Sequence, residues 1–246
     1  MFALISILVW GVSIILSVLF FIPALVLFLL TFWWDRNRRI LHLYTCVWGA
    51  SYAFINPLIR VKVEDRLKLK IKGPRIFVCN HQSLYDISII FHLFTHLKWI
   101  AKKSLFRIPF VGWNMAMNGY INLDREDRKS QEKMLNKSIS YLDHGSSLMI
   151  FPEGTRTPDG NVKRFKGGAF KLAFDTMTPI VPLVIDGSYQ AVPKHGVFMK
   201  HAQKIIIKVL DPVFPKDFDS YRSLRDHVRS LMERAHQELH MRLVTA

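Results

Sequence analysis

The stretch RIFVCNHQSLYD at residues 75–86 decides the fold class. Its first five residues form a short apolar run typical of a buried strand, and a polar cluster follows where that strand would end. Similar short apolar runs alternate with amphipathic stretches farther along the chain, which is typical of an α/β sheet. The sequence therefore predicts an α/β fold with a mixed, mostly parallel sheet flanked by helices, preceded by an N-terminal membrane-associated helical segment.

The expected elements follow from the period of the apolar residues. Candidate strands are Arg75–Cys79, Lys98–Ala101, Tyr120–Leu123, Leu148–Phe151, Ile180–Ile185 and Lys204–Leu210. Candidate helices are Leu84–Phe94, Arg128–Leu142, Gly168–Asp175 and a C-terminal helix with Leu224, Val228, Leu231, Ala235 and Leu239 on one face.

The N-terminal segment is apolar enough to enter lipid. Residues 1–34 contain no charged side chain, and the run is too long for an ordinary core helix. A straight helix of this length would measure about 50 Å against a hydrocarbon core of about 30 Å, so it must tilt, bend or lie partly in the interface. Pro23 is the expected bend. A secretory signal peptide is the alternative, but the segment lacks a basic start and a small-residue cleavage site.

The residues after this run indicate its orientation. Trp33 and Trp34 suit the headgroup level, and Arg36, Arg38 and Arg39 follow at once, which places this end on the cytoplasmic side. A second, weakly apolar stretch covers residues 40–59. If it crossed the bilayer, the basic remainder of the chain would lie outside, so we expect an interfacial helix packed beside the first.

The charge of the chain calls for an anionic partner. The formal net charge is +15, which suits nucleic acid or an acidic membrane face. The chain has no zinc-finger spacing, RNP-like aromatic signature or recognition-helix pattern, so the membrane is the preferred partner and nucleic acid is not expected. Cys46 and Cys79 are the two cysteines, both in apolar stretches, so no disulfide framework is indicated and a reducing compartment fits.

The polar cluster NHQSLYD contains a candidate catalytic pair. A carboxylate within reach of an imidazole fixes its tautomer and stabilises the imidazolium, so we assign His81 as general base and Asp86 as its orienting group. Residues five apart do not share a face of a regular helix, so His81 is expected in the turn and Asp86 on the following helix. The alternative is a capping Asp beside a surface His.

A second polar motif, FPEGTR at 151–156, follows another apolar run. Gly154 allows a tight turn, and Arg156 has the fork-shaped cation best suited to phosphate. Glu153 could hold Arg156 or a substrate hydroxyl in place. The alternative is a solvated turn with a structural ion pair.

These motifs resemble the glycerolipid acyltransferase family, in particular the 1-acylglycerol-3-phosphate acyltransferases. The resemblance covers roughly residues 60–215 and rests on blocks in the family's order, with a small departure at Thr157, where the family more often has Ser. The blocks are NHQSLYD (80–86), GYINLDR (119–125), FPEGTRT (151–157) and IVPLVI (180–185), with AKKSLFRIPFVG (101–112) and FKGGAF (165–170) between them.

The resemblance implies direct acyl transfer from a thioester, either acyl-CoA or acyl carrier protein, to the 2-hydroxyl of lysophosphatidic acid. His81 would act as base and Asp86 would orient it, with no acyl-enzyme, metal or cofactor. The substrate-binding residues implied are Lys102, Arg125, Glu153, Gly154, Thr155 and Arg156, with the cations on the acceptor phosphate.

The apolar segment, the arginines that follow it and the extent of the resemblance together predict a division of the chain and a location. Residues 1–60 would be membrane-anchoring helices and residues 61–246 the catalytic domain. That domain would lie on the cytoplasmic side of the cell inner membrane or another cytoplasm-facing membrane, among phospholipids.

Other interpretations stay open. Cys79 lies two residues before His81 and could act as a nucleophile with it. The pairs His92/His96 and His236/His240 have i, i+4 spacing that can bind zinc, although we interpret both as solvated or packing histidines. The protein could also use another acceptor, such as glycerol-3-phosphate or a different lysophospholipid, or bind lipid without chemistry.

Overall fold

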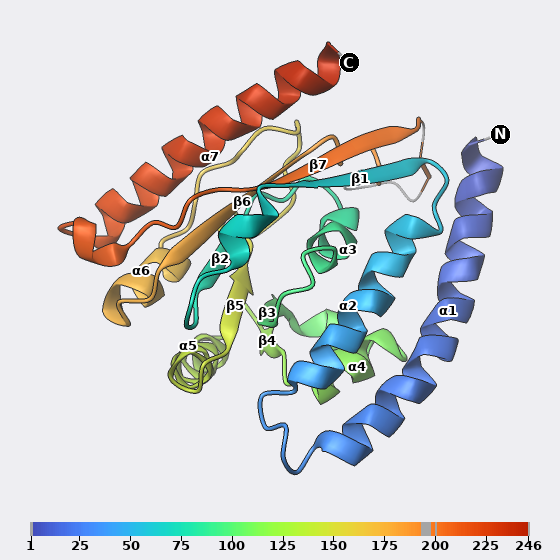
Figure 1. The fold of residues 1–246 in the computed structure, drawn as a ribbon, viewed down its shortest axis with the longest axis horizontal. Helices are drawn as coiled ribbons and strands as arrows, with labels where there is room; N and C mark the ends of the chain where they lie inside the picture. The colour runs from blue at the N-terminus through green and yellow to red at the C-terminus, as the bar shows by residue number, and fades with distance from the viewer. Residues whose placement is uncertain (1, 193–197, 200, 246) are drawn as a thin grey trace.

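The computed structural model describes residues 2–192, 198–199 and 201–245. A seven-stranded sheet lies between two layers of helices (Figure 1). The strands are β1 (Ile59–Glu64), β2 (Ile76–Cys79), β3 (Leu97–Lys102), β4 (Ile121–Leu123), β5 (Ser147–Ile150), β6 (Ile180–Asp186) and β7 (Gln203–Val209). The helices are α1 (Phe2–Thr31), α2 (Arg39–Phe54), α3 (Tyr85–Phe91), α4 (Val111–Met117), α5 (Arg128–Asp143), α6 (Gly168–Asp175) and α7 (Tyr221–Val244), with 3-10 turns η1 (Arg66–Leu69), η2 (Lys103–Arg107) and η3 (Pro215–Asp217).

The strand order of the sheet is β1-β7-β6-β2-β5-β3-β4. The β6–β7 pair is antiparallel and the other pairs are parallel. The prediction of a mixed, mostly parallel sheet is therefore confirmed. Strands β2 to β6 all run in one direction, so their carboxyl ends meet at a single edge of the sheet.

Each strand in the middle of the sheet buries both of its faces. In β2, Phe77 and Cys79 pack with α2 and α3, whereas Ile76 and Val78 pack with α6 and α7. All four side chains are fully buried, and each large apolar side chain buried in this way stabilises the fold by about 1.5–3 kcal/mol. Burial on both faces is why these strands appear in the sequence as continuous apolar runs.

The predicted elements match the structure closely except after the N-terminal segment. The helix α6 has the predicted bounds, and the apolar face of α7 also buries Met232 and His236, while Leu231 is only partly buried.

The prediction of one helix over residues 40–59 is wrong, because α2 ends at Phe54 and β1 begins at Ile59. In β1 charged and apolar residues alternate, as suits an edge strand. The short helix α4 was not predicted either.

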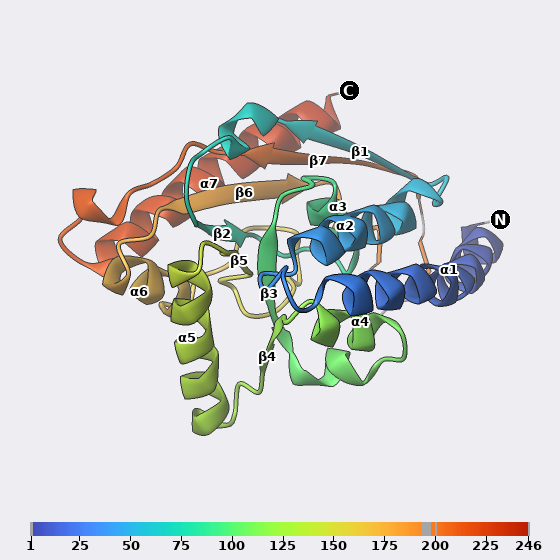
Figure 2. The same cartoon turned by 60° about the horizontal axis from the view of Figure 1, so that its bottom comes forward.

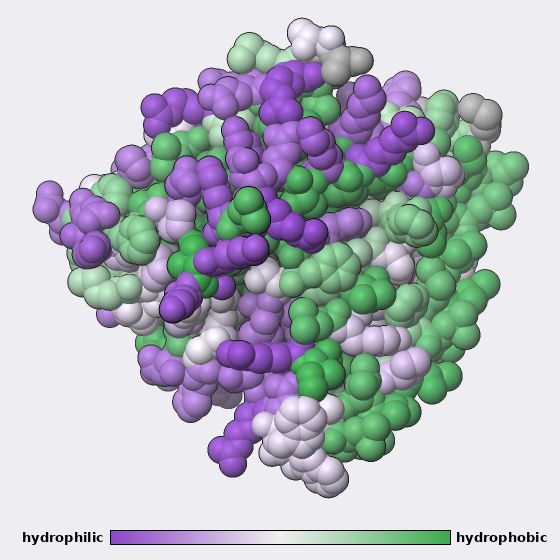
Figure 3. All heavy atoms as spheres, in the orientation of Figure 1, coloured by the Kyte–Doolittle hydropathy of each residue, from purple (hydrophilic) through white to green (hydrophobic). Residues whose placement is uncertain are grey.

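Helix α1 is long and almost entirely apolar. Among the described residues it is the one helix that is long and apolar enough to cross a membrane. Pro23 lies inside the helix and does not end it. At 1.5 Å per residue the helix measures about 45 Å. Figure 3 shows hydrophobic residues gathered along α1, where most of the side chains are exposed.

Helix α2 packs beside α1, as predicted, and also against the body of the protein (Figure 2). The rings of Phe20 and Trp48 stack at 6.0 Å, and the Ser17 and Tyr52 hydroxyls lie 2.8 Å apart. The opposite side of α2 covers α3. The second apolar stretch is therefore part of the helical layer over the sheet as well as a partner of α1.

A buried lysine fixes the connection between α1 and α2. The Lys98 ammonium donates to the carbonyl oxygens of Asn37 at 2.7 Å and Asn118 at 2.6 Å. Burial lowers the pKa of Lys98 to about 7. Because Lys98 belongs to β3, this contact fixes the end of the apolar segment relative to the sheet.

Candidate active site

The site residues predicted from the sequence gather at the edge where strands β2 to β5 end. His81 and Asp86 follow β2, Lys102 ends β3, Arg125 follows β4 and the Glu153–Arg156 loop follows β5. These strands lie in the order β2-β5-β3-β4 and share one direction. Ligands of open α/β sheets commonly bind at the carboxyl ends of the strands.

His81 and Asp86 are in direct contact. His81 Nδ1 lies 2.8 Å from Asp86 Oδ2, with His81 in the turn after β2 and Asp86 in the first turn of α3, as predicted. The carboxylate also accepts from the backbone amides of Gln82 at 2.6 Å and Ser83 at 2.8 Å. A carboxylate oxygen accepts hydrogen bonds, so we assign the Nδ1 proton to this contact, which leaves Nε2 as the ring nitrogen that can accept a proton.

The imidazole of His81 is also held from its face. Its ring stacks on Phe151 with centroids 4.0 Å apart and planes 13° apart. Phe151 in turn contacts Trp99 on β3, with centroids 5.9 Å apart. The His81 side chain remains 15% exposed, so the ring is oriented by Asp86 and Phe151 and still reachable. Nothing in the sequence marked Phe151 as a site residue beyond its place at the start of FPEGTR.

Glu153 lies beneath the turn that carries His81. Glu153 is only 4% exposed, and its Oε1 accepts a long hydrogen bond of 3.4 Å from the backbone amide of His81. The other oxygen, Oε2, is buried without a hydrogen-bond partner among the described residues. Burial raises the pKa of Glu153 to about 8, against the lowering effect of backbone amides from Lys163 and His81. The predicted contact of Glu153 with Arg156 or a substrate hydroxyl stays a prediction.

The loop after β5 is hydrogen-bonded to two other segments that carry motifs of the sequence, NHQSLYD and GYINLDR. Gly154 adopts a left-handed φ of 75°, and its amide donates to the Phe151 carbonyl at 3.1 Å. Arg125 Nη1 donates to the Gly154 carbonyl, and the amide of Thr157 donates to the His81 carbonyl at 2.8 Å. The loop is thus hydrogen-bonded to the turn after β2 and to the segment after β4. Within it, Thr155 is exposed and Arg156 is partly buried.

A cationic hollow adjoins this loop. Its volume is about 380 Å³, and Lys102 and Arg125 both line it. Lys102 lies opposite Leu123 in the β3–β4 register, which brings the ends of the two strands together. The other lining residues are Lys103, Ser104, Arg107, Leu123, Asp124 and Glu126. Four cations against two carboxylates suit a phosphate group. Arg156 does not line this hollow.

The structure argues against Cys79 as a nucleophile. Its side chain is fully buried, and burial raises the pKa of the thiol well above its ordinary value. A thiol in this state is not a competent nucleophile.

The histidine pairs make polar contacts with protein groups. His92 and His96 contact the Ser88 carbonyl and the Ser146 hydroxyl, while His236 and His240 both contact Asp186. In the part of the chain that the structure describes, no group of three His, Cys, Asp or Glu side chains could hold a metal ion.

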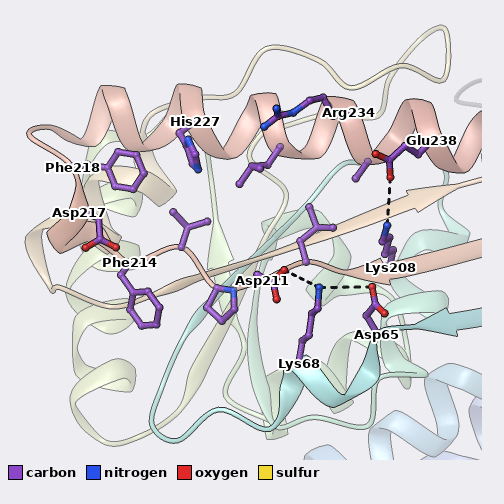
Figure 4. A pocket seen from close by; sticks show the side chains of 15 residues that line it. Asp65, Lys68, Lys208, Asp211, Phe214, Asp217, Phe218, His227, Arg234 and Glu238 are labelled. Atoms are coloured by element: carbon purple, nitrogen blue, oxygen red, sulfur yellow. Dashed lines mark hydrogen bonds and ion pairs between the residues drawn. The ribbon is translucent and has the colours of Figure 1, made fainter.

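A larger hollow of about 730 Å³ runs along α7 (Figure 4). Ion pairs occupy part of it, with Lys68 2.9 Å from Asp211 and Lys208 3.6 Å from Glu238. Its lining includes Val213, which bridges to Ile180 at the start of β6, whereas His81 follows the end of the parallel strand β2. None of the predicted site residues lines this hollow.

Comparisons with known proteins agree with one another. Residues 60–186 match the family described as Acyltransferase. A 1-acyl-sn-glycerol-3-phosphate acyltransferase from Chlamydomonas reinhardtii is 35% identical over 74% of this chain and 54% of its own length. One from Haemophilus influenzae is 30% identical over 79% of this chain and 90% of its own length. The chain spans 49–64% of the length of the first curated relatives it matches.

A solved structure is also similar to the whole fold. The crystal structure of the 1-acyl-sn-glycerophosphate acyltransferase PlsC from Thermotoga maritima superposes with a TM-score of 0.71 at 29% identity. The similarity covers 94% of this chain and 97% of that one.

The buried Glu153 predicts a specific pH dependence of stability. Its pKa in the folded protein, about 8, lies above the ordinary value of 4.5, so the fold favours the protonated acid. That stabilisation is complete below about pH 4.5 and is lost as the pH rises through about 8. Glu153→Gln keeps a neutral group at all pH values. Between pH 5 and 8 the unfolding free energy of the wild type should therefore fall relative to this variant, by at most about 1.4 kcal/mol per pH unit.

Thermal or urea unfolding in one detergent, at four pH values from 5 to 9, measures this difference. Parallel stability profiles for the wild type and Glu153→Gln would show that Glu153 is already ionised in the folded protein.

Proposed function

The chain belongs to the acyltransferase family that includes the 1-acyl-sn-glycerol-3-phosphate acyltransferases, and from this membership we propose that it acylates lysophosphatidic acid. A fatty acyl group passes from a thioester to the 2-hydroxyl of the acceptor, giving phosphatidic acid. The observation that carries the proposal is the contact between His81 and the buried Asp86, at the same sheet edge as the cationic hollow of Lys102 and Arg125.

The proposed chemistry uses Nε2 of His81, the ring nitrogen that does not contact Asp86. Nε2 takes the proton of the 2-hydroxyl while that oxygen attacks the thioester carbonyl, and Asp86 stabilises the imidazolium that forms. The tetrahedral intermediate then expels the thiolate, which takes the proton back from His81. The burial of Cys79 supports this direct route over a covalent acyl-enzyme. The acyl donor, acyl-CoA or acyl carrier protein, is a substrate, and no resident cofactor takes part.

The acceptor phosphate is proposed to bind the cations beside this centre. Lys102 and Arg125 line the hollow, and Arg156 lies in the loop after β5 that Arg125 contacts. Glu153, Gly154 and Thr155 complete the proposed substrate-binding loop. Charge-assisted hydrogen bonds to a phosphate are stronger than neutral ones, so these residues would fix the acceptor with its hydroxyl toward His81.

The apolar α1 supports a membrane location for the reaction. Its length and composition suit a membrane anchor, and the arginines that follow it favour a cytoplasmic position for the rest of the chain. A net charge of +15 attracts anionic headgroups, at about 1 kcal/mol for each cation near the surface. We therefore propose that α1 anchors the chain in a cytoplasm-facing membrane. The predicted division after residue 60 would cut β1, and α2 packs on α3, so we propose that the catalytic domain begins with α2.

Removing the base should stop the reaction. His81→Ala is expected to lower kcat by about 10²–10⁴-fold, because general-base catalysis contributes this much. The assay measures acylation of lysophosphatidate and of other lysophospholipids by purified protein in detergent, with acyl-CoA and acyl carrier protein donors in separate arms. His144→Ala is the matched control, since His144 is exposed and its Nδ1 contacts the carbonyl of Ser140 within the same helix end. Full turnover by His81→Ala would contradict the mechanism, and a preference for another acceptor would change the assigned substrate.

Removing one phosphate-binding cation should weaken acceptor binding instead. Lys102→Ala is expected to raise the KM for lysophosphatidate about tenfold with little change in kcat, because it removes a charge-assisted contact. Lys129→Ala removes the same charge from the exposed surface of α5 and controls for attraction to the lipid surface. Equal effects of the two substitutions would remove Lys102 from the phosphate site.

A further inference from the structure

The two oxygens of the Asp86 carboxylate are held unequally. Oδ2 accepts from His81 Nδ1 and from the amides of Gln82 and Ser83. Oδ1 accepts one hydrogen bond among the described residues, from the Ser188 hydroxyl at 2.6 Å. Asp86 and Ser188 are both fully buried, so water has no access to replace that donor. The orientation of the carboxylate plane therefore depends on Ser188.

The sheet brings Ser188 to this position although it lies 102 residues after Asp86 in the sequence. Strand β6 lies beside β2 in parallel register, with Cys79 opposite Leu183, so the residues that follow the two strands meet at the same edge. Gly187 makes the turn with a φ of 87°, where an added Cβ would lie 2.1 Å from the Lys204 carbonyl oxygen. This close backbone approach directs Ser188 toward the turn after β2.

Gln82 holds Ser188 in place from the side. Its Oε1 accepts from the Ser188 amide at 3.3 Å and lies 3.0 Å from the Ser188 hydroxyl. A hydroxyl carries one hydrogen, so the shorter, charge-assisted contact with Asp86 takes it. Gln82 Nε2 donates to the carbonyl of Gly160 at 2.7 Å and to Asp186 Oδ1 at 3.1 Å.

Asp186 accepts the hydrogen bond from Gln82 as a carboxylate, because its pKa is low. Burial would raise its pKa, but hydrogen bonds from His236 and Gln82 outweigh burial and lower the pKa to about 2. His236 belongs to α7, so the chain of contacts from Asp86 ends on the C-terminal helix. Ser188 is thus held by an arrangement that includes the carboxylates of Asp86 and Asp186.

We propose that Ser188 is a positioning residue for acyl transfer, and the inference rests on the proposed function. Its hydroxyl fixes the rotation of the Asp86 carboxylate, so that Oδ2 remains in line with His81 Nδ1. Without it Oδ1 has no donor, and the buried carboxylate turns toward other amides at the expense of its contact with His81. Ser188 touches no reacting atom, so its loss should act on turnover and leave acceptor binding unchanged.

Three substitutions test this inference in the full-length protein. Ser188→Ala is expected to lower kcat about 10- to 100-fold with an unchanged KM for lysophosphatidate, because a hydrogen bond to a charged group is lost. Ser188→Thr retains the hydroxyl and should recover most of that loss. Ser138→Ala is the matched control, because Ser138 is also fully buried but its hydroxyl donates to the Met134 carbonyl within α5.

Wild-type activity with each acceptor is measured first, so a failure of the proposed function appears before any variant is compared. The variants are then assayed with the acceptor that the wild type uses, and Tm is recorded for each. A kcat of Ser188→Ala within twofold of the wild type, or a loss confined to KM, would overturn the inference. If Ser188→Ala does not fold, Ser188→Cys keeps the volume with a weaker donor, and its full activity would overturn the inference in the same way.

Discussion

The 2.8 Å hydrogen bond between His81 Nδ1 and the fully buried Asp86 carboxylate is the contact around which the rest of the site is arranged. A buried carboxylate is costly unless its oxygens are hydrogen-bonded. Here the backbone of the turn, the imidazole and the Ser188 hydroxyl supply the donors. The turn after β2 therefore cannot change shape without leaving a charged group unpaired, and the direction of the imidazole is set by the fold.

The parallel strands of the sheet bring the other site residues to the same edge as His81. Strands β2 to β6 end at one edge, so residues far apart in the sequence become neighbours there. Direct contacts then join the segments, since Arg125 donates to the loop after β5 and Thr157 to the His81 carbonyl. Phe151 completes the arrangement by stacking on the imidazole. The proposed acyl transfer uses three of these features: the imidazole of His81, the cationic hollow and the nearby apolar helix α1.

Much of this could be predicted from the sequence because the signals are local. The strand before His81 is an apolar run, and the polar motifs lie directly after such runs. The strand β1 was missed because it directly follows the apolar stretch of α2. Only the alternation of apolar and charged residues from Ile59 onward marks the change from the helical period to the period of two that is typical of a strand. Ser188 could not be predicted, because its partner Asp86 lies 102 residues away and only the β2–β6 pairing unites them. The raised pKa of Glu153 likewise depends on burial that its polar neighbours in the sequence do not indicate.

The most direct test of the central claim is a structure of the wild-type protein with lysophosphatidate bound and no acyl donor present. We predict that the 2-hydroxyl oxygen lies about 3 Å from His81 Nε2, with the phosphate against Lys102 and Arg125. A lipid whose hydroxyl lies away from His81, or whose phosphate occupies the hollow along α7, would contradict it.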